Sequence, residues 1–263
     1  MQTDIVLNPI DVSAPMFLEA ARRAEAAGFG AVWTYDHISA VAFRGHATLD
    51  VWSMLGAVAA VTERVHLGPL VVNTPARHPA HIAVASASLQ ALSGGRFGLG
   101  LGAGAGTESK YSEELAMVGL PVLDAASRRQ RVVEAIEVLR AVWARDPRYV
   151  GIALPEPPPP IYVAANGPRL AAVAGAHADA VNFHDWQADL PGAVAAAVAA
   201  AREAGNEGFR VTLEVPFEEK WLRADSAERE GVAELGVSQV MARWSADLGL
   251  DAIEAAARWT ETA

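Results

Sequence analysis

The sequence predicts an α/β fold, a (β/α)8 barrel of the TIM type that takes in residues 1–263 as a single domain. Short apolar runs rich in β-formers alternate with alanine-rich stretches of helical periodicity, and eight such runs occur. Hydrophobic residues make up 52% of the chain, enough for one large core. Eight strands joined by helical crossovers are parallel and close most naturally into a barrel, whereas an open, doubly wound sheet is the main alternative.

The expected strands are the apolar runs that lie between the helical stretches. They are Asp4–Leu7, Ala31–Tyr35, Val65–Val72, Phe97–Leu101, Ile161–Ala164, Ala180–Asn182, Val211–Val215 and Gln239–Arg243. A proline-rich segment, residues 155–160, precedes the fifth of them. Because proline fixes φ and lacks an N–H, we expect this segment to be an extended connector.

Helical spacing of apolar residues marks the segments between the strands. One face of the first helix carries Phe17, Ala20, Ala21, Ala24 and Ala27, and one face of a later helix carries Val132, Ile136, Leu139 and Trp143. Gly28 is expected to end the first helix by turning the chain. Asp225 followed by Glu228 predicts a capping box for the helix before the last strand.

Composition excludes several classes of function. The chain has no cysteine, which excludes disulfides and thiolate zinc sites, and its net charge of −10 argues against a nucleic-acid partner. The sequence contains no run of about 18 apolar residues, so no membrane span is expected. It also lacks the basic cluster that begins a secretion signal. His78 and His81 share a helical face without a third ligand, so we expect no metal site. A cytoplasmic location is expected.

The candidate catalytic residues follow the second strand, because barrel enzymes place their sites at the carboxyl ends of the strands. His37 is a group that titrates near neutral pH, and the carboxylate of Asp36 is its neighbour in the chain. The alternative is that Asp36 caps the following loop and His37 faces solvent.

Two other strand ends carry candidate binding residues. Asn73 lies where the third strand should reach the site. After the fifth strand, the small residues up to Gly167 precede a helix N-terminus, which favours an anion site, although an ordinary tight turn fits as well. Alternating glycines from residue 94 to 106 run through a strand instead of a strand-to-helix turn, so the dinucleotide-binding signal is weak.

Taken in order, these segments resemble the luciferase-like superfamily, and especially its F420-dependent branch. The segments that carry the resemblance are residues 28–33 leading to Asp36-His37, residues 59–68, Arg77–Ala80, residues 92–97 with 100–104, and residues 160–168 through 178–182. They cover somewhat over half of the chain. Everything after His184 is short compared with the family pattern, and the resemblance fades there.

The resemblance implies a flavin or deazaflavin ring at the carboxyl end of the barrel. The ring would rest on a bulge at Leu70-Val71, which in the family often contains a non-proline cis peptide, and His37 would lie beside the reactive ring carbon. Asn73 would contact the polar edge of the ring. The remaining cofactor contacts implied are Gly104 and Glu108 in the lining loop, and Ala164, Ala165, Asn166 and Gly167 along the ribityl and phosphate portion.

Residues in the later strand ends are candidates for the substrate and for the phosphate. Tyr35, His184 and Trp186 border predicted strand ends and are expected in the substrate pocket, although Trp186 fits equally under a loop. Lys220, Arg223 and Arg243 follow the last two strands, where barrels often bind phosphate, so they are candidate phosphate contacts. A solvated cationic face is the alternative for each.

The function expected from the resemblance is hydride transfer between coenzyme F420 and a small organic substrate, with His37 as the proton donor or acceptor. Three alternatives stay open. The first is a monooxygenase that uses flavin mononucleotide (FMN). The second is a non-catalytic cofactor-binding protein of the same fold, and the third is a nicotinamide dehydrogenase with an open sheet. The resemblance also implies a homodimer formed through barrel-side helices.

Overall fold

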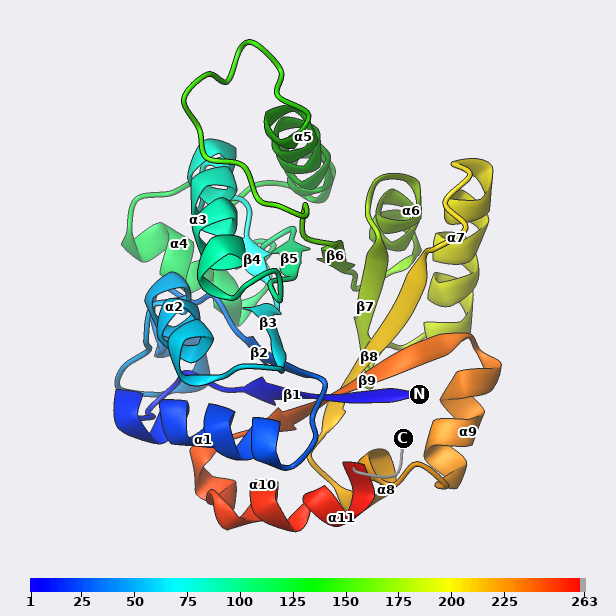
Figure 1. The fold of residues 1–263 in the computed structure, drawn as a ribbon. Helices are drawn as coiled ribbons and strands as arrows, with labels where there is room; N and C mark the ends of the chain where they lie inside the picture. Colours follow the sequence, from blue (N-terminus) through cyan, green and yellow to red (C-terminus); the bar gives the residue numbers. More distant parts are fainter. Residues whose placement is uncertain (261–263) are drawn as a thin grey trace.

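The computed structural model describes residues 1–260, and all of its strands belong to one parallel sheet (Figure 1). Their order is β3-β2-β1-β9-β8-β7-β6-β5-β4. The strands are β1 Gln2–Leu7, β2 Ala31–Thr34, β3 His66–Pro69, β4 Val72–Asn73, β5 Leu99–Gly102, β6 Ile161–Ala164, β7 Ala180–His184, β8 Arg210–Pro216 and β9 Val237–Trp244. Consecutive strands pair with each other except β3 and β4, which lie at the two ends of this order, and β1 pairs with β9 to join the two ends of the chain.

The two outermost strands of this order, β3 and β4, are consecutive in the chain. A cis peptide bond between Leu70 and Val71 separates them, so the third strand expected from the sequence is present as two short pieces. Leu67 of β3 also bridges to Phe97, just before β5. The sheet therefore nearly closes on itself, which confirms the barrel and makes the open, doubly wound alternative wrong.

Helices surround the strands (Figure 1). Those longer than five residues are α1 Ala14–Ala26, α2 Val51–Val61, α3 Pro79–Leu92, α5 Ala125–Trp143, α6 Pro168–His177, α7 Leu190–Glu203 and α9 Ala227–Glu234. The shorter ones are α4 Glu113–Met117, α8 Glu219–Leu222, α10 Asp251–Ala255 and α11 Ala257–Thr260, with 3-10 turns at Val41–Phe43, Lys110–Ser112 and Ala246–Leu248. No helix in the described part of the chain is long and apolar enough to cross a membrane.

Alternation along each strand divides the buried side chains into two groups. Ile5 and Leu7 of β1 belong to the large core between sheet and helices, whereas Val6 belongs to a smaller cluster inside the barrel. The inner cluster also holds Trp33 and Tyr162, whose rings meet edge-on with centroids 4.9 Å apart. Large side chains therefore fill the barrel, as in other barrels of this type.

A buried carboxylate lies near the amino ends of the strands. Asp4 is fully buried and accepts hydrogen bonds from Trp33 Nε1 (2.7 Å) and Gln2 Nε2 (2.7 Å), and also from Gln239. Burial raises the pKa of Asp4 to about 6 despite these bonds. This polar cluster closes the barrel opposite to the end where the candidate residues lie.

Local signals in the sequence set most helix ends. Gly28 follows the first helix with φ of 82°, and its N–H donates to Glu25, as expected. The capping box was placed one residue early: α9 begins after Ser226, whose hydroxyl accepts from Arg229 N at 3.3 Å. Asp225 does not cap the helix because Arg223 holds its carboxylate at 3.1 Å.

We predict that Gly175→Ala destabilises the protein. A Cβ at this position in α6 would overlap the backbone carbonyl of Ala197 in α7, so the two helices would have to move apart. Such overpacking lowers the free energy of unfolding by about 1–3 kcal/mol, which urea unfolding followed by circular dichroism measures.

Gly231→Ala is the matched control. Gly231 lies in the exposed α9 with nothing within 4 Å of the added Cβ, so alanine should leave stability unchanged or raise it by up to about 1 kcal/mol. Equal losses in the two variants would contradict the close α6–α7 contact.

Candidate functional site

A cavity of about 1250 Å³ opens at the carboxyl ends of the strands. Ligand pockets generally have volumes of roughly 300–1,000 Å³, so this one has room for a cofactor and a substrate together. Most residues singled out from the sequence line it. These are Tyr35, Asp36, His37, Leu70, Val71, Asn73, Gly104, Ala164, Asn166, Gly167, His184, Trp186 and Arg243.

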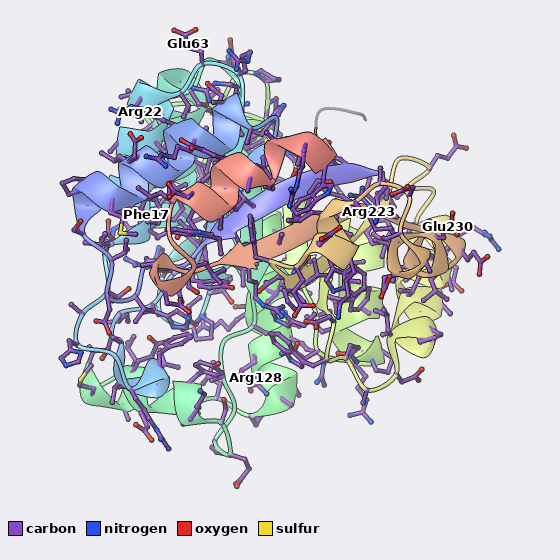
Figure 2. All side chains as sticks on the ribbon, turned by 90° about the horizontal axis from the view of Figure 1, so that it is seen from below. Phe17, Arg22, Glu63, Arg128, Arg223 and Glu230 are labelled. Carbon is purple, nitrogen blue, oxygen red and sulfur yellow. The ribbon has the colours of Figure 1, made fainter. Side chains whose placement is uncertain are left out.

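Four predicted residues are placed elsewhere. Glu108 is exposed and does not line the cavity, and Ala165 is fully buried, with its N–H donated to Asn182. Lys220 and Arg223 lie in a separate surface groove, where they pair with Glu218 at 2.8 Å and Asp225 at 3.1 Å. Figure 2 shows Arg223 well apart from Arg128, which lines the cavity. These four residues do not line this cavity, because the course of the loops and the direction of each side chain, which the sequence does not show, carry them elsewhere.

His37, which is half-buried, and the buried Glu114 form a pair just after β2. His37 Nδ1 lies 3.2 Å from Glu114 Oε2, and the same oxygen accepts from the backbone N–H of Ile38 at 3.0 Å. The His37 ring also packs edge-on against Phe43, with centroids 4.7 Å apart, and lies over Tyr111. A Nδ1–H donated to a carboxylate fixes the imidazole and leaves Nε2 as the nitrogen that exchanges protons.

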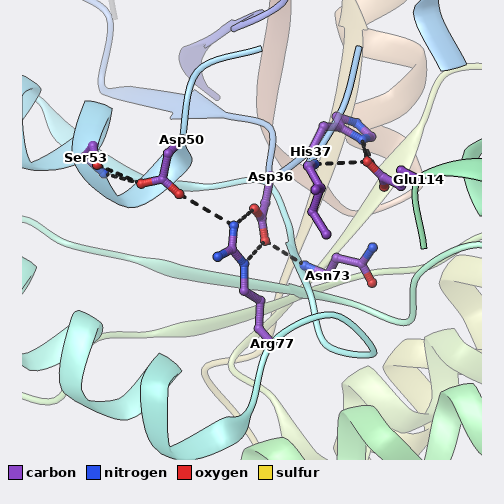
Figure 3. Close-up of polar contacts among 8 residues, drawn as sticks. Asp36, His37, Asp50, Ser53, Asn73, Arg77 and Glu114 are labelled. Atoms are coloured by element: carbon purple, nitrogen blue, oxygen red, sulfur yellow. Dashed lines mark hydrogen bonds and ion pairs between the residues drawn. The ribbon is translucent and has the colours of Figure 1, made fainter. Parts of the chain in front are cut away.

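Asp36 points away from His37 (Figure 3). Its carboxylate accepts from Arg77 Nη2 at 2.6 Å and Nε at 3.2 Å, and from the backbone N–H of Asn73 at 3.2 Å. Arg77 also lies 3.6 Å from Asp50, which caps α2. Asp36 thus ties the end of β2 to β4 and to the segment before α3, as a two-pronged Arg–carboxylate pair can.

A row of four lining residues crosses the sheet at one level. Asn73 pairs in register with Gly102, Gly102 with Ala164, and Ala164 with Asn182. Two small residues therefore lie between two amides, and the row spans roughly 14 Å at the usual strand spacing. Asn73 Oδ1 and Asn182 Nδ2 are buried without a hydrogen-bond partner among residues 1–260. One unused acceptor and one unused donor fit a flat ligand with polar edges.

A second titratable cluster lies at the ends of β7, β8 and β9. Tyr35 donates its hydroxyl hydrogen to Glu214 Oε1 at 2.8 Å, and His184 Nδ1 lies 3.5 Å from Oε2 without forming a hydrogen bond. Arg243 donates to the backbone oxygen of Glu214 at 3.3 Å and pairs with Asp185 at 2.9 Å.

Burial shifts the titration of this cluster. It raises the pKa of Glu214 to about 7, against the opposing hydrogen bond of Tyr35 and the charge of Arg243. It also raises the pKa of Tyr35 well above its usual value, and with Arg243 it lowers the pKa of His184 to about 4. At neutral pH His184 is therefore uncharged, and Glu214 is close to its midpoint.

Three arginines line another part of the cavity. Arg128 and Arg129 belong to the first turns of α5, and Arg169 to the first turn of α6. None of them makes an ion pair within residues 1–260, although Arg128 donates to Gly104 O at 2.7 Å. Gly167 caps α6 without a side-chain hydrogen bond, so the helix N-terminus adds free N–H groups. This region can hold an anion.

Sequence reasoning missed two carboxylates of the site. Glu214 had a visible signal, because it is the one charged residue within the apolar run Val211–Val215, with an inward position on its strand. Glu114 had none, because a loop and a 3-10 turn after β5 bring it back beside His37. The helix start after Gly167 was expected to favour an anion, but the arginines at the starts of α5 and α6 were not singled out, because nothing in the sequence shows that these two helix starts face the same cavity.

Comparisons with known proteins agree with this geometry. Residues 8–233 match the family model described as luciferase-like monooxygenase. An F420-dependent glucose-6-phosphate dehydrogenase of Beutenbergia cavernae is 38% identical over 164 residues, 58% of this chain and 47% of that protein. An F420-dependent hydroxymycolic acid dehydrogenase of Mycobacterium tuberculosis is 32% identical over 187 residues, 66% of this chain and 50% of that protein. The chain thus spans about half the length of the curated relatives it matches.

Solved structures share the fold over almost the whole chain. An F420-dependent secondary alcohol dehydrogenase in complex with an F420-acetone adduct superposes with a TM-score of 0.77 at 20% identity, over 98% of this chain and 97% of that one. The coenzyme F420-dependent tetrahydromethanopterin reductase of Methanopyrus kandleri gives 0.76 at 20% identity, over 99% and 98%. At this identity the likeness shows the fold alone.

We predict that Glu214 and His184 change the free energy of unfolding with pH in opposite directions. The pKa of Glu214 is raised from 4.5 to about 7, so the folded state binds more protons than the unfolded chain in this window, and stability falls as pH rises through it. The pKa of His184 is lowered from 6.5 to about 4, so stability is lost as pH falls between these values.

Urea unfolding of the wild type, Glu214→Gln and His184→Asn from pH 4.5 to 7.5 measures both effects. The stability of Glu214→Gln relative to wild type should increase with pH by on the order of 3 kcal/mol, whereas that of His184→Asn should increase as pH falls. Differences in stability between each variant and wild type that stay constant with pH would contradict the assigned pKa shifts.

Proposed function

The chain belongs to the luciferase-like monooxygenase family, and from this premise we propose that it is an oxidoreductase that transfers a hydride between coenzyme F420 and a small organic substrate. The row from Asn73 to Asn182, with its two unpartnered amide atoms, is the observation that carries the proposal. The names of the sequence relatives support F420 as the cofactor.

The lining residues fit such a cofactor. We propose that the Leu70–Val71 segment and the row from Asn73 to Asn182 hold its ring, because the small residues Gly102 and Ala164 leave space over the strands and an amide lies at each end of the row. Gly104, with φ of +65°, keeps the adjoining loop close to Asn73, since a Cβ there would lie 2.7 Å from Asn73 Oδ1. When bound, coenzyme F420 accepts or supplies a hydride ion.

The phosphate-bearing tail of the cofactor fits the region of the three arginines. Residues Ala164–Gly167 lead from the ring site to the start of α6, where Arg169 and the free helix N–H groups lie. Arg128 and Arg129 line the cavity at the start of α5. This replaces the assignment of Lys220 and Arg223, which lie in another groove.

We propose that His37 exchanges the proton that accompanies hydride transfer. Glu114 holds the ring through Nδ1, so Nε2 can take the proton of a substrate hydroxyl or return one to a carbonyl oxygen. Asp36, which the sequence suggested as a second catalytic residue, acts in this proposal as a positioning residue, because Arg77 and Asn73 occupy its carboxylate. Aromatic side chains around His37 limit the access of water.

Three finer assignments are also proposals. We propose that the chain acts as one domain, in the cytoplasm and as a homodimer. Its partner in the reaction is a small molecule, as the size of the cavity and the names of the relatives support.

Binding titrations test the cofactor. Fluorescence quenching should show micromolar binding of F420, and Arg169→Ala should weaken it about tenfold because a charged hydrogen bond to the tail is lost. Lys220→Ala is the matched control and should leave the affinity unchanged, since its ammonium group pairs with Glu218. Preference for FMN would move the function to a monooxygenase, and binding of neither cofactor would refute an oxidoreductase.

Kinetics test the role of His37. Isopropanol and acetone are suitable probes, and His37→Asn should lower the rate of F420 reduction or oxidation by roughly 10²–10⁴-fold with little change in cofactor affinity. Glu114→Gln should lower the rate less, because the imidazole stays in place but is less well oriented. A His37→Asn variant with the wild-type rate would exclude this residue as the proton carrier.

A further inference from the structure

An exposed tryptophan lies in the part of the cavity formed by β7, β8 and β9. Trp186 follows β7, lines the cavity and is 62% exposed. Its ring is stacked on His184, with centroids 4.2 Å apart and planes within 9°, and the Arg243 guanidinium carbon lies 4.5 Å from the ring. The side chain is thus held in a defined place by His184 and Arg243, while much of its surface stays exposed at the cavity. Such a surface favours contact with a flat apolar group.

The charges of this region do not favour an anion. Arg243 is the one cation among the described lining residues that come from β7–β9 and the segments after them, and it is paired with Asp185 at 2.9 Å. The carboxyl groups of Glu214 and Glu218 line the same region, Glu218 being paired with Lys220. A phosphate group here would meet acids and a guanidinium that is already neutralised. The unpaired arginines lie at the starts of α5 and α6 instead.

Polar groups suited to a neutral oxygen lie beside the tryptophan. The Tyr35 hydroxyl donates to Glu214, and the ring centroids of Tyr35 and His37 are 6.2 Å apart. A substrate hydroxyl can donate its hydrogen to His37 Nε2, and a carbonyl oxygen can accept one from the protonated imidazole. The Tyr35 oxygen, whose hydrogen goes to Glu214, can only accept. Phe43 and Tyr111, which line the cavity around His37, add further aromatic surface.

We propose that the substrate of this site is an uncharged molecule with a flat unsaturated ring, which packs against Trp186 and presents its hydroxyl or carbonyl oxygen to His37. Phosphorylated sugars are excluded. The inference rests on the proposed function, and it separates this chain from the relatives named for glucose 6-phosphate.

Isothermal titration calorimetry tests the inference directly. Acetophenone and glucose 6-phosphate are titrated into the full chain, once saturated with F420 and once without cofactor. Acetophenone should bind at least about tenfold more tightly than glucose 6-phosphate. Trp186→Ala should weaken acetophenone binding about fivefold, as expected for the loss of one aromatic contact, and Trp186→Phe should restore most of it.

Leu92→Ala is the control, because Leu92 is also 62% exposed but does not line the cavity. It should change neither affinity, and Trp186→Ala should leave the F420 affinity unchanged. In the F420-saturated chain, binding of glucose 6-phosphate as tight as that of acetophenone would overturn the inference. Acetophenone binding that Trp186→Ala leaves unchanged would overturn it as well. Failure of F420 to bind the wild type would refute the proposed function instead, and the titrations without cofactor would still decide the role of Trp186.

Discussion

Inward alternation along parallel strands is the constraint on which the rest of this molecule depends. Every second residue of a barrel strand faces the interior, so a strand delivers one side chain to the cavity for each one it gives to the outer core. β2 gives Trp33 to the inner cluster and Tyr35 to the cavity, and Thr34 between them turns outward to bind Leu7 O. β8 presents Glu214 between Leu213 and Val215, which belong to the outer core.

The cavity has two chemically different regions, and this difference follows from which elements reach it. Helix starts contribute cations and free N–H groups, as at Arg169 and Gly167. Strand ends contribute buried acids and aromatic rings, as at Glu214 and Trp186. A ligand that carries an anionic tail and a second ligand without charge can therefore occupy the same cavity without competing for the same groups.

The fold was readable from the sequence because each strand and each long helix carried its own periodicity. The barrel and the single parallel sheet followed, and the resemblance located the Leu70–Val71 break that divides the third strand. Residues at strand ends were expected to face one cavity, and Tyr35 and Asn73 line it. Loops were not readable: the contact between His37 and Glu114 joins residues 77 positions apart through an irregular segment, and no local pattern encodes it. For the same reason the partner of Asp36 was not its neighbour His37 but Arg77, 41 residues later.

The buried cluster around Asp4, together with Trp33 and Tyr162, fills the barrel beneath the cavity. Ligands therefore come and go through the mouth at the carboxyl ends of the strands. A molecule resting on the row from Asn73 to Asn182 lies deep in this mouth, and one that packs against the exposed Trp186 lies nearer to solvent. With both proposed ligands bound, an outer ligand that lies between the inner one and solvent would slow the release of the inner one.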